Sequence, residues 1–175
     1  MKKKDPKRQL QGAMSKAKGK NFETYIDQSF DFYAYKGEAL IDKTPEPMRP
    51  TKSLGGGKFI AFFEKKAQPD YKGTLKGGRT VIFEAKFTSK DRMEQSRVLD
   101  AQADYLTRHE RMGALCYIIA GFGSGEIYCI PWKVWRNMKE LFGRKYVTEE
   151  DIEKHRVAVG RNGLLMLLDQ EGELA

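Results

Sequence analysis

The chain has 175 residues, of which 40% are hydrophobic, and a formal net charge of +8. This length suits one domain with a real core, and no apolar run is long enough to cross a membrane. The two cysteines and two histidines are solitary, which argues against a zinc site, a disulfide framework and most Ser/His or Cys/His nucleophiles. Any metal would therefore have to be held by oxygen.

The positive charge is concentrated in two blocks. Residues 1–20 carry eight Lys or Arg against one Asp, and we interpret 1–18 as a flexible basic arm. Residues 44–90 carry ten Lys or Arg against four acids. Such a distribution predicts a polyanionic partner. Because no apolar segment follows the basic arm, a secretory signal is not expected, and we predict a cytoplasmic protein.

The first predicted element is an amphipathic helix over residues 21–35, where aromatic and aliphatic residues recur every three to four positions. A short strand is expected at 38–44. Residues 45–69 then contain three prolines in six positions and the run Gly55-Gly56-Gly57, which exclude a continuous helix. This segment is long for a connection in a compact domain, so we interpret it as a stalk insertion that projects from the sheet.

A β-hairpin is predicted next, because segments of strand character flank Lys76-Gly77-Gly78-Arg79. A three-residue connection would place Asp70 opposite Glu84, whereas a two-residue turn would place Tyr71 there, and the sequence leaves both open. The remaining predicted elements are a helix over 93–111, strands at 114–122 and 126–132, a helix over 132–142, a short helix capped by Thr148, and a late strand or buried segment at 163–169. This order predicts an α/β fold, with a mixed β-sheet flanked by helices, in a single domain over residues 19–175.

The second strand of this hairpin carries two charged residues in an otherwise apolar run, VIFEAKF. Side chains alternate along a strand, so Glu84 and Lys86 point to the same face. Alone, such a pair is more often a solvated ion pair than a functional site. Candidates on neighbouring elements strengthen the functional interpretation, and the full set is Glu23, Asp70, Glu84, Lys86 and Gln102.

Three carboxylates with a lysine and no histidine suit Mg²⁺, which takes few protein oxygens and keeps waters and phosphate oxygens. Such an ion can activate a water and clamp a phosphodiester. Lys86 can then orient or deprotonate that water, or offset the charge that develops on phosphorus. Taken by itself, Glu23 could equally be an acid that stabilises the N-terminus of its helix.

An acid followed about a dozen residues later by Glu-x-Lys on a hairpin resembles the catalytic pattern of the restriction-endonuclease-like nucleases. The chain further resembles the RecU-type Holliday junction resolvases of bacteria and their phages. Six pieces that occur in the order of that family carry the resemblance: KGKNFE, DKTPEP, DYKG, FEAK, AQADYL and EIYCIP. Together they extend over about residues 18–142.

The resemblance implies a restriction-endonuclease-like fold and an endodeoxyribonuclease, dependent on Mg²⁺ with Mn²⁺ as a substitute. A homodimer would resolve four-way junctions by paired nicks in recombination and repair, with recombination proteins as further partners. Asp70 and Glu84 would bind the metal, Lys86 would serve catalysis, and Glu23 and Gln102 would complete the site. The stalk insertion would point toward the junction centre. Basic residues there and on the next strand are the expected DNA contacts: Arg49, Lys52, Lys58, Lys65, Lys66 and Lys72.

Two alternatives remain open. The chain could be a restriction or repair endonuclease with another DNA target, or a junction-binding protein whose catalytic site has decayed. The intact set of Asp70, Glu84 and Lys86 argues against the second.

Overall fold

The computed structural model describes residues 20–45, 47–63 and 68–169, so the predicted basic arm lies outside the described residues. The helices are α2 (Lys20–Lys36), α3 (Asp100–Arg111), α4 (Trp132–Arg136) and α5 (Met138–Phe142), with 3₁₀ helices η1 (Gln95–Arg97) and η2 (Glu153–His155). The strands are β1 (Ala39–Lys43), β2 (Met48–Gly55), β3 (Lys58–Phe63), β4 (Tyr71–Leu75), β5 (Thr80–Thr88), β6 (Arg92–Glu94), β7 (Leu115–Phe122), β8 (Ile127–Pro131) and β9 (Tyr146–Thr148). No helix among these residues is long and apolar enough to span a membrane.

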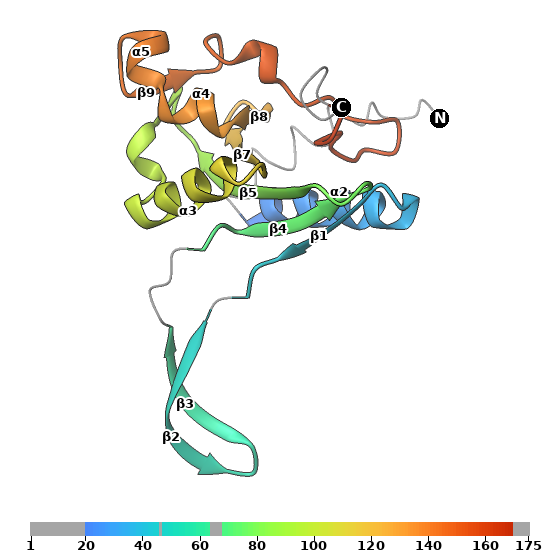
Figure 1. Ribbon diagram of the computed structural model, residues 1–175, viewed down its shortest axis with the longest axis vertical. Coiled ribbons are helices and arrows are strands. Elements are labelled where there is room, and N and C mark those ends of the chain that lie inside the picture. The colour runs from blue at the N-terminus through green and yellow to red at the C-terminus, as the bar shows by residue number, and fades with distance from the viewer. Residues whose placement is uncertain (1–19, 46, 64–67, 170–175) are drawn as a thin grey trace.

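A five-stranded mixed sheet forms the centre of the fold, with strand order β1-β4-β5-β7-β8 (Figure 1). Only β5 and β7 pair in parallel, and the other neighbours in this sheet are antiparallel. Helix α2 packs on one face, and α3 and α4 pack on the other. The predicted α/β fold with a mixed sheet flanked by helices is confirmed.

Strand β5 separates two hydrophobic cores by simple alternation. Val81 and Phe83 pack with α2, while Ile82 packs with α3 and α4 on the opposite face. The predicted first helix is also confirmed: α2 buries Ile26 and Phe30 among their core neighbours and ends before Gly37. Gly37 has a φ of 68°, a conformation that favours glycine. The face of the sheet toward α3 is thus the face that carries Glu84 and Lys86.

The hairpin β4–β5 has the register of the three-residue connection. The backbone N–H of Leu75 donates to the carbonyl of Arg79 at 2.9 Å, and Tyr71 pairs with Phe83. One more step in this register places Asp70 opposite Glu84. The alternative in which Tyr71 faces Glu84 is excluded.

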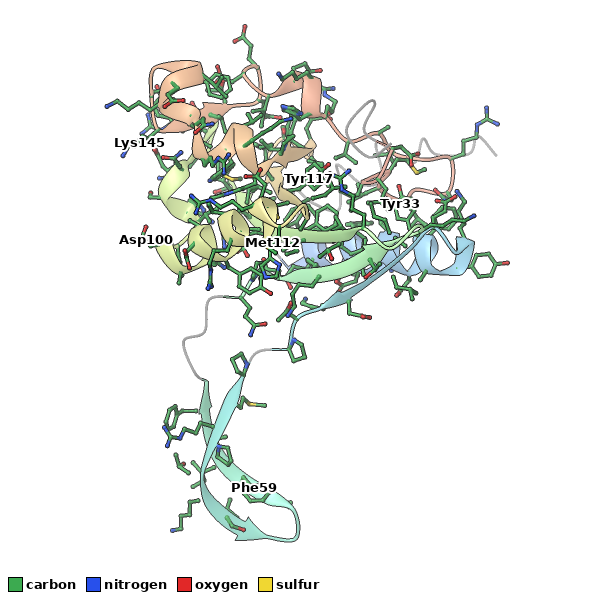
Figure 2. All side chains as sticks on the ribbon, in the orientation of Figure 1. Tyr33, Phe59, Asp100, Met112, Tyr117 and Lys145 are labelled. Atoms are coloured by element: carbon green, nitrogen blue, oxygen red, sulfur yellow. The ribbon has the colours of Figure 1, made fainter. Side chains whose placement is uncertain are left out.

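Residues 48–63 form a separate two-stranded hairpin, β2–β3, which extends away from the main sheet (Figure 1). Every residue of β2 is exposed, and Figure 2 shows Phe59 of β3 on the hairpin well away from the main sheet. At the base of the stalk insertion, the backbone N–H of Thr44 donates to the carbonyl of Asp70 at 2.7 Å. This hydrogen bond links the end of β1, where the insertion starts, to Asp70, the predicted site residue that follows the insertion.

The helix predicted over residues 93–111 begins too early. Residues 92–94 form β6, in which buried Met93 pairs with Val147 of β9, and the regular helix begins only at Asp100. Leu99, an apolar residue within the predicted helix, is 60% exposed. The error arises because apolar residues at helical spacing before Asp100 belong to a strand and a 3₁₀ turn.

The helix predicted over residues 132–142 is interrupted at Asn137 and forms α4 and α5 instead. The side-chain amide of Gln95 donates to the carbonyls of Trp135 and Arg136 at 2.7 and 3.0 Å. In a continuous helix those carbonyls would accept from N–H groups four residues later. A contact from a distant segment therefore replaces the helical bonds at the break.

The helix predicted after Thr148 is also wrong. Thr148 is the last residue of β9, and its hydroxyl donates to Asp151 at 2.9 Å while turns and η2 follow. In the segment 163–169 the buried-segment alternative holds. Leu165 and Leu167 pack into the α2 core, and the N–H of Leu165 donates to Ser29 at 2.9 Å.

We predict that Gly73→Ala destabilises the protein. A Cβ at this β4 position would fall on the Leu40 carbonyl oxygen and lie 2.6 Å from the Ile41 Cα of β1. Forcing such an overlap costs about 1–3 kcal/mol or more, and each kcal/mol lowers the Tm by about 2–4 °C in a chain of this size. Thermal melting measures the effect, with Thr74→Ala at the exposed neighbouring position as the control. Equal melting of the two variants would contradict the close packing of β1 on β4.

Candidate catalytic site

Asp70, the residue before β4, and Glu84 on β5 belong to the sheet face that α3 covers, which we call the catalytic face. The three-residue hairpin connection sets them opposite each other. Asp70 Oδ2 accepts a hydrogen bond from the backbone N–H of Ala85 at 2.8 Å. One of the two predicted metal ligands is therefore fixed to the strand that carries the other.

The carboxylate of Glu84 is completely buried and has partners from two elements. Its Oε1 accepts from the ammonium of Lys86 on the same strand and from Nε2 of Gln102 on α3 at 2.6 Å. The other amide atom of Gln102, Oε1, accepts from the backbone N–H of Leu99 at 3.1 Å. Because both ends of this amide are used, the first turn of α3 fixes the donor that holds Glu84.

Burial governs the electrostatics of this pair of carboxylates. Loss of solvation is the main cause that raises the pKa of Glu84 from 4.5 to about 7, and the nearby charge of Asp70 raises it further. Burial also raises the pKa of Asp70, against the hydrogen bond from Ala85, which lowers it. Two carboxyl groups that resist ionisation side by side are a typical arrangement for binding a cation.

The residues present fit a hard divalent cation. Glu84 Oε2 is buried and accepts no hydrogen bond, although a buried carboxylate oxygen is costly without a partner. Within the described ranges, no cluster of three or more His, Cys, Asp or Glu side chains could hold a metal. Two carboxylates would leave the remaining positions to water and phosphate oxygens, a distribution that Mg²⁺ accepts readily.

Glu23 lies beside this site and is held by another residue. It projects from the first turn of α2, and its Oε2 accepts from the Lys43 ammonium at 2.5 Å. That hydrogen bond is the main cause that raises the pKa of Lys43. The negative charge of Glu23 contributes to the raised pKa of Asp70. Of the five predicted site residues, hydrogen bonds and strand register bring together Asp70, Glu84, Lys86 and Gln102.

Sequence reasoning missed the residues that surround Glu23. Lys43 also lies 3.9 Å from Asp27, whose carboxylate accepts from the Tyr71 hydroxyl at 2.6 Å. Lys43 and Tyr71 occur inside DKTPEP and DYKG, two of the pieces that resemble the family, and this was the only feature of the sequence that could have drawn attention to them. Neither could be linked to Glu23 without knowing that β1 and β4 pair beside α2.

The predicted DNA contacts fall in different places. Arg49, Lys52 and Lys58 are exposed on the β2–β3 hairpin. Lys72 is on β4, on the catalytic face, and donates to Gln68 Oε1 at 2.9 Å. The remaining two predicted contacts, Lys65 and Lys66, lie outside the described residues.

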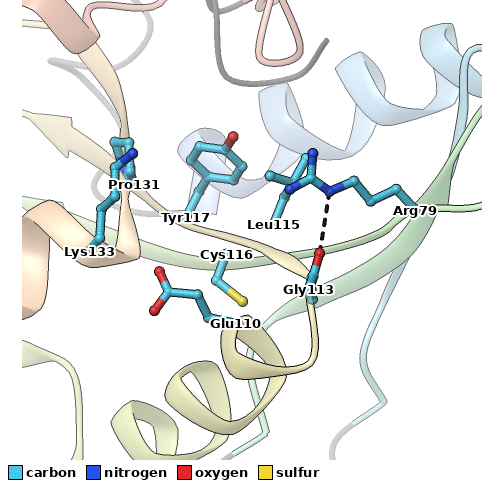
Figure 3. A pocket seen from close by; sticks show the side chains of 9 residues that line it. Arg79, Glu110, Gly113, Leu115, Cys116, Tyr117, Pro131 and Lys133 are labelled. Carbon is cyan, nitrogen blue, oxygen red and sulfur yellow. Dashed lines mark hydrogen bonds between the residues drawn. The ribbon is translucent and has the colours of Figure 1, made fainter.

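A separate cleft of about 360 Å³ lies at the other end of β5 and β7 (Figure 3). There Arg79 donates to the carbonyl of Gly113 at 3.3 Å, and Lys133 lies on the opposite side. None of the predicted site residues lines this cleft. It is therefore distinct from the candidate catalytic site.

The profile of one protein family, Recombination protein U (RecU), matches residues 17–169. The chain belongs to the RecU family. Relatives named Holliday junction resolvase RecU include one from Bacillus pumilus (strain SAFR-032), 28% identical over 159 residues, which covers 83% of this chain and 75% of that protein. Another, from Streptococcus gordonii (strain Challis), is 27% identical over 153 residues and covers 83% of this chain and 76% of that protein.

A solved structure also resembles this RecU-family chain. It is Hjc, a Holliday junction resolvase from Archaeoglobus fulgidus, with a TM-score of 0.45 and 14% sequence identity. The alignment covers 77% of this chain and 92% of that one.

The raised pKa of Glu84 predicts a pH-dependent stability of the metal-free protein. A buried carboxyl with a folded-state pKa of about 7 stabilises the fold fully below about pH 4.5, and this contribution is lost as the pH rises through about 7. Glu84→Gln cannot ionise. We expect the parent to lose stability between pH 5 and pH 8 while Glu84→Gln does not. Measured with chelator present, the Tm of Glu84→Gln minus the Tm of the parent should therefore be larger at pH 8 than at pH 5. The increase should be at least about 2–4 °C, which corresponds to about 1 kcal/mol. A difference that is the same at both pH values would contradict the burial of a titrating carboxyl.

Proposed function

We propose that this chain is a divalent-metal-dependent DNA endonuclease that resolves four-way junctions in recombination. The main support for a catalytic metal site is the buried carboxylate of Glu84. Its Oε1 is held by Lys86 and Gln102, while its Oε2 accepts no hydrogen bond, and the second acid, Asp70, is half-buried beside it. A decayed site would not need to maintain so costly a group. Membership in the RecU family and the names of its relatives support the junction as the substrate.

In this proposal Asp70 and Glu84 hold Mg²⁺, for which Mn²⁺ can substitute. When bound, the ion supplies an activated water and offsets negative charge on the phosphodiester. Gln102 and Lys86 keep the Glu84 carboxylate in one orientation, so that its Oε2 points where a cation is needed. The Lys86 ammonium, which is partly exposed, is the donor that orients the attacking water or offsets charge at phosphorus. Glu23 and its partner Lys43 border the site.

The stalk insertion supplies substrate choice in this proposal. A homodimer would present two β2–β3 hairpins to the open centre of a junction, which linear duplex lacks. Arg49, Lys52 and Lys58 suit phosphate contacts. The hairpin also exposes apolar side chains, among them Phe59 at 59% and Phe62 at 53%. Exposed aromatic rings can stack on bases at the junction centre, where pairing is strained.

We predict that Glu84→Gln abolishes junction cleavage and leaves junction affinity within about twofold, because most affinity comes from Lys and Arg contacts to phosphate. Cleavage of labelled junctions in Mg²⁺ and binding in chelator measure the two effects. Glu140→Gln, on the distant and exposed first turn of α5, is the matched control. Full activity of Glu84→Gln would mean that the metal site is misassigned.

Lys86→Ala should lower kcat by at least about 100-fold, the usual contribution of a positioned proton-transfer group. It should still bind the metal, because the proposed ligands are retained. Titration calorimetry with Mg²⁺ in the presence of junction DNA separates the two properties. If Lys86→Ala no longer binds the metal, the role of Lys86 is to maintain the metal site and not to take part in the chemical step.

The stalk insertion provides a test of substrate choice. We expect that replacing residues 49–66 with a short Gly/Ser linker leaves the fold and the cleavage chemistry intact but removes the preference for junctions over duplex of equal length. Competition binding at two salt concentrations measures this preference, because salt screens the phosphate contacts. A preference that survives at both salts would place recognition on the main sheet and its helices.

A further inference from the structure

A cleft between α3 and the uncovered part of the sheet lies on the same sheet face as the catalytic carboxylates, and the proposed chemistry does not use it. Its volume is about 380 Å³. Strands β1, β4 and β5 and helix α3 provide the residues that define it: Asp42, Lys72, Thr74, Thr80, Tyr105 and His109. Thr44 at the base of the stalk insertion also lines it. The cleft therefore lies between the stalk insertion and α3.

Strand register places this cleft on the catalytic face. Lys72 pairs with Ile82, and Thr74 pairs with Thr80, so these side chains share a face with Glu84, two residues beyond Ile82. At about 3.3 Å per residue, Ile82 and Thr80 are roughly 7 and 13 Å from Glu84 along β5. One DNA strand advances about 3.4 Å per nucleotide, so the cleft is about two to four nucleotides from the catalytic carboxylate.

An aromatic pair forms the α3 side of the cleft. The rings of Tyr105 and His109 stack with centroids 4.3 Å apart and an interplanar angle of 22°. They lie one helical turn apart, and Gln102 precedes Tyr105 by three residues, so all three share one side of α3. The residue that holds Glu84 and the aromatic pair are thus positioned by the same rigid helix.

The lining fits a nucleoside better than an isolated phosphate. Lys43 and Lys72 both line the cleft, but Lys43 is bonded to Glu23, and Asp42 is the cross-strand partner of Lys72 and would repel a phosphate bound there. The threonine hydroxyls offer neutral hydrogen bonds, and the aromatic pair offers a stacking surface. The volume is at the small end of the range for ligand sites, which suits a single nucleoside and excludes a duplex.

We propose that this cleft holds one nucleoside of the strand that is cut, two to four nucleotides from the scissile phosphate, with its base against the Tyr105–His109 pair. The inference rests on the proposed nuclease function, because that function supplies the DNA strand at Glu84. It assigns to α3 a second role besides holding the catalytic carboxylate.

Photocrosslinking of the full, unaltered chain tests the contact directly. Four-way junctions that carry 5-iodouracil at each of the first five positions on either side of the cut are bound in chelator, irradiated and digested with trypsin. We expect a crosslink at the second to fourth position, on the peptide of residues 98–108, which contains Tyr105. The internal control is the peptide of residues 146–154, which carries Tyr146 of β9 and no residue of the candidate site. Absence of the 98–108 crosslink, or equal labelling of both peptides, overturns the inference.

Substitutions give an independent readout. Tyr105→Ala should weaken junction binding at least about fivefold, the lower limit for losing one base stack. Tyr105→Phe should bind as the parent does, and Tyr35→Ala is the matched control. Melting curves identify any loss of fold, and the crosslink does not depend on the variants. If the parent cuts junctions but Tyr105→Ala binds normally, the nucleoside site is wrong and the nuclease function stands; if the parent binds and crosslinks but never cuts, the nuclease function fails alone.

Discussion

The burial of one carboxylate, that of Glu84, is the constraint on which the rest of the site depends. Removing a carboxylate from water costs several kcal/mol unless partners compensate. Lys86 and Gln102 provide part of that compensation at a single oxygen, Oε1. The part of the desolvation cost that is not compensated appears as the raised pKa of Glu84, and a bound cation would offset this cost. The fold therefore holds the site in a state that favours binding of a divalent ion.

Strand register turns this local arrangement into a site. A slip of β5 by one residue would direct Glu84 into the α2 core and Phe83 toward α3, because successive side chains alternate between faces. Two features oppose such a slip: the three-residue turn that aligns Leu75 with Arg79, and the parallel pairing with β7, whose side chains are sorted between the same two cores. Hydrophobic sorting thus fixes where the charged residues lie.

The parts of the site that the sequence predicted are those set by local pattern. Alternation along β5 assigned Glu84 and Lys86 to one face, and the Gly-Gly turn reduced the position of Asp70 to two choices. The start of α3 and the break at Asn137 were not predictable, because each depends on a contact with a distant segment. Met93 pairs with β9, and the side-chain amide of Gln95 donates to the carbonyls at the break. The pairing of Glu23 with Lys43 required knowledge of how α2 packs beside β1, which no local signal contains.

The stalk insertion and the two proposed metal ligands, Asp70 and Glu84, are linked by hydrogen bonds from backbone N–H groups. Thr44, where the chain leaves β1 for the insertion, donates to the carbonyl of Asp70, where it enters β4. The side chain of Asp70 is in turn bonded to the N–H of Ala85, next to Glu84. These two bonds form a continuous connection from the base of the insertion to both carboxylates. In the proposed function, a shift of the β2–β3 hairpin on DNA would act on Asp70 through this connection, so shape recognition and metal binding would meet at this residue.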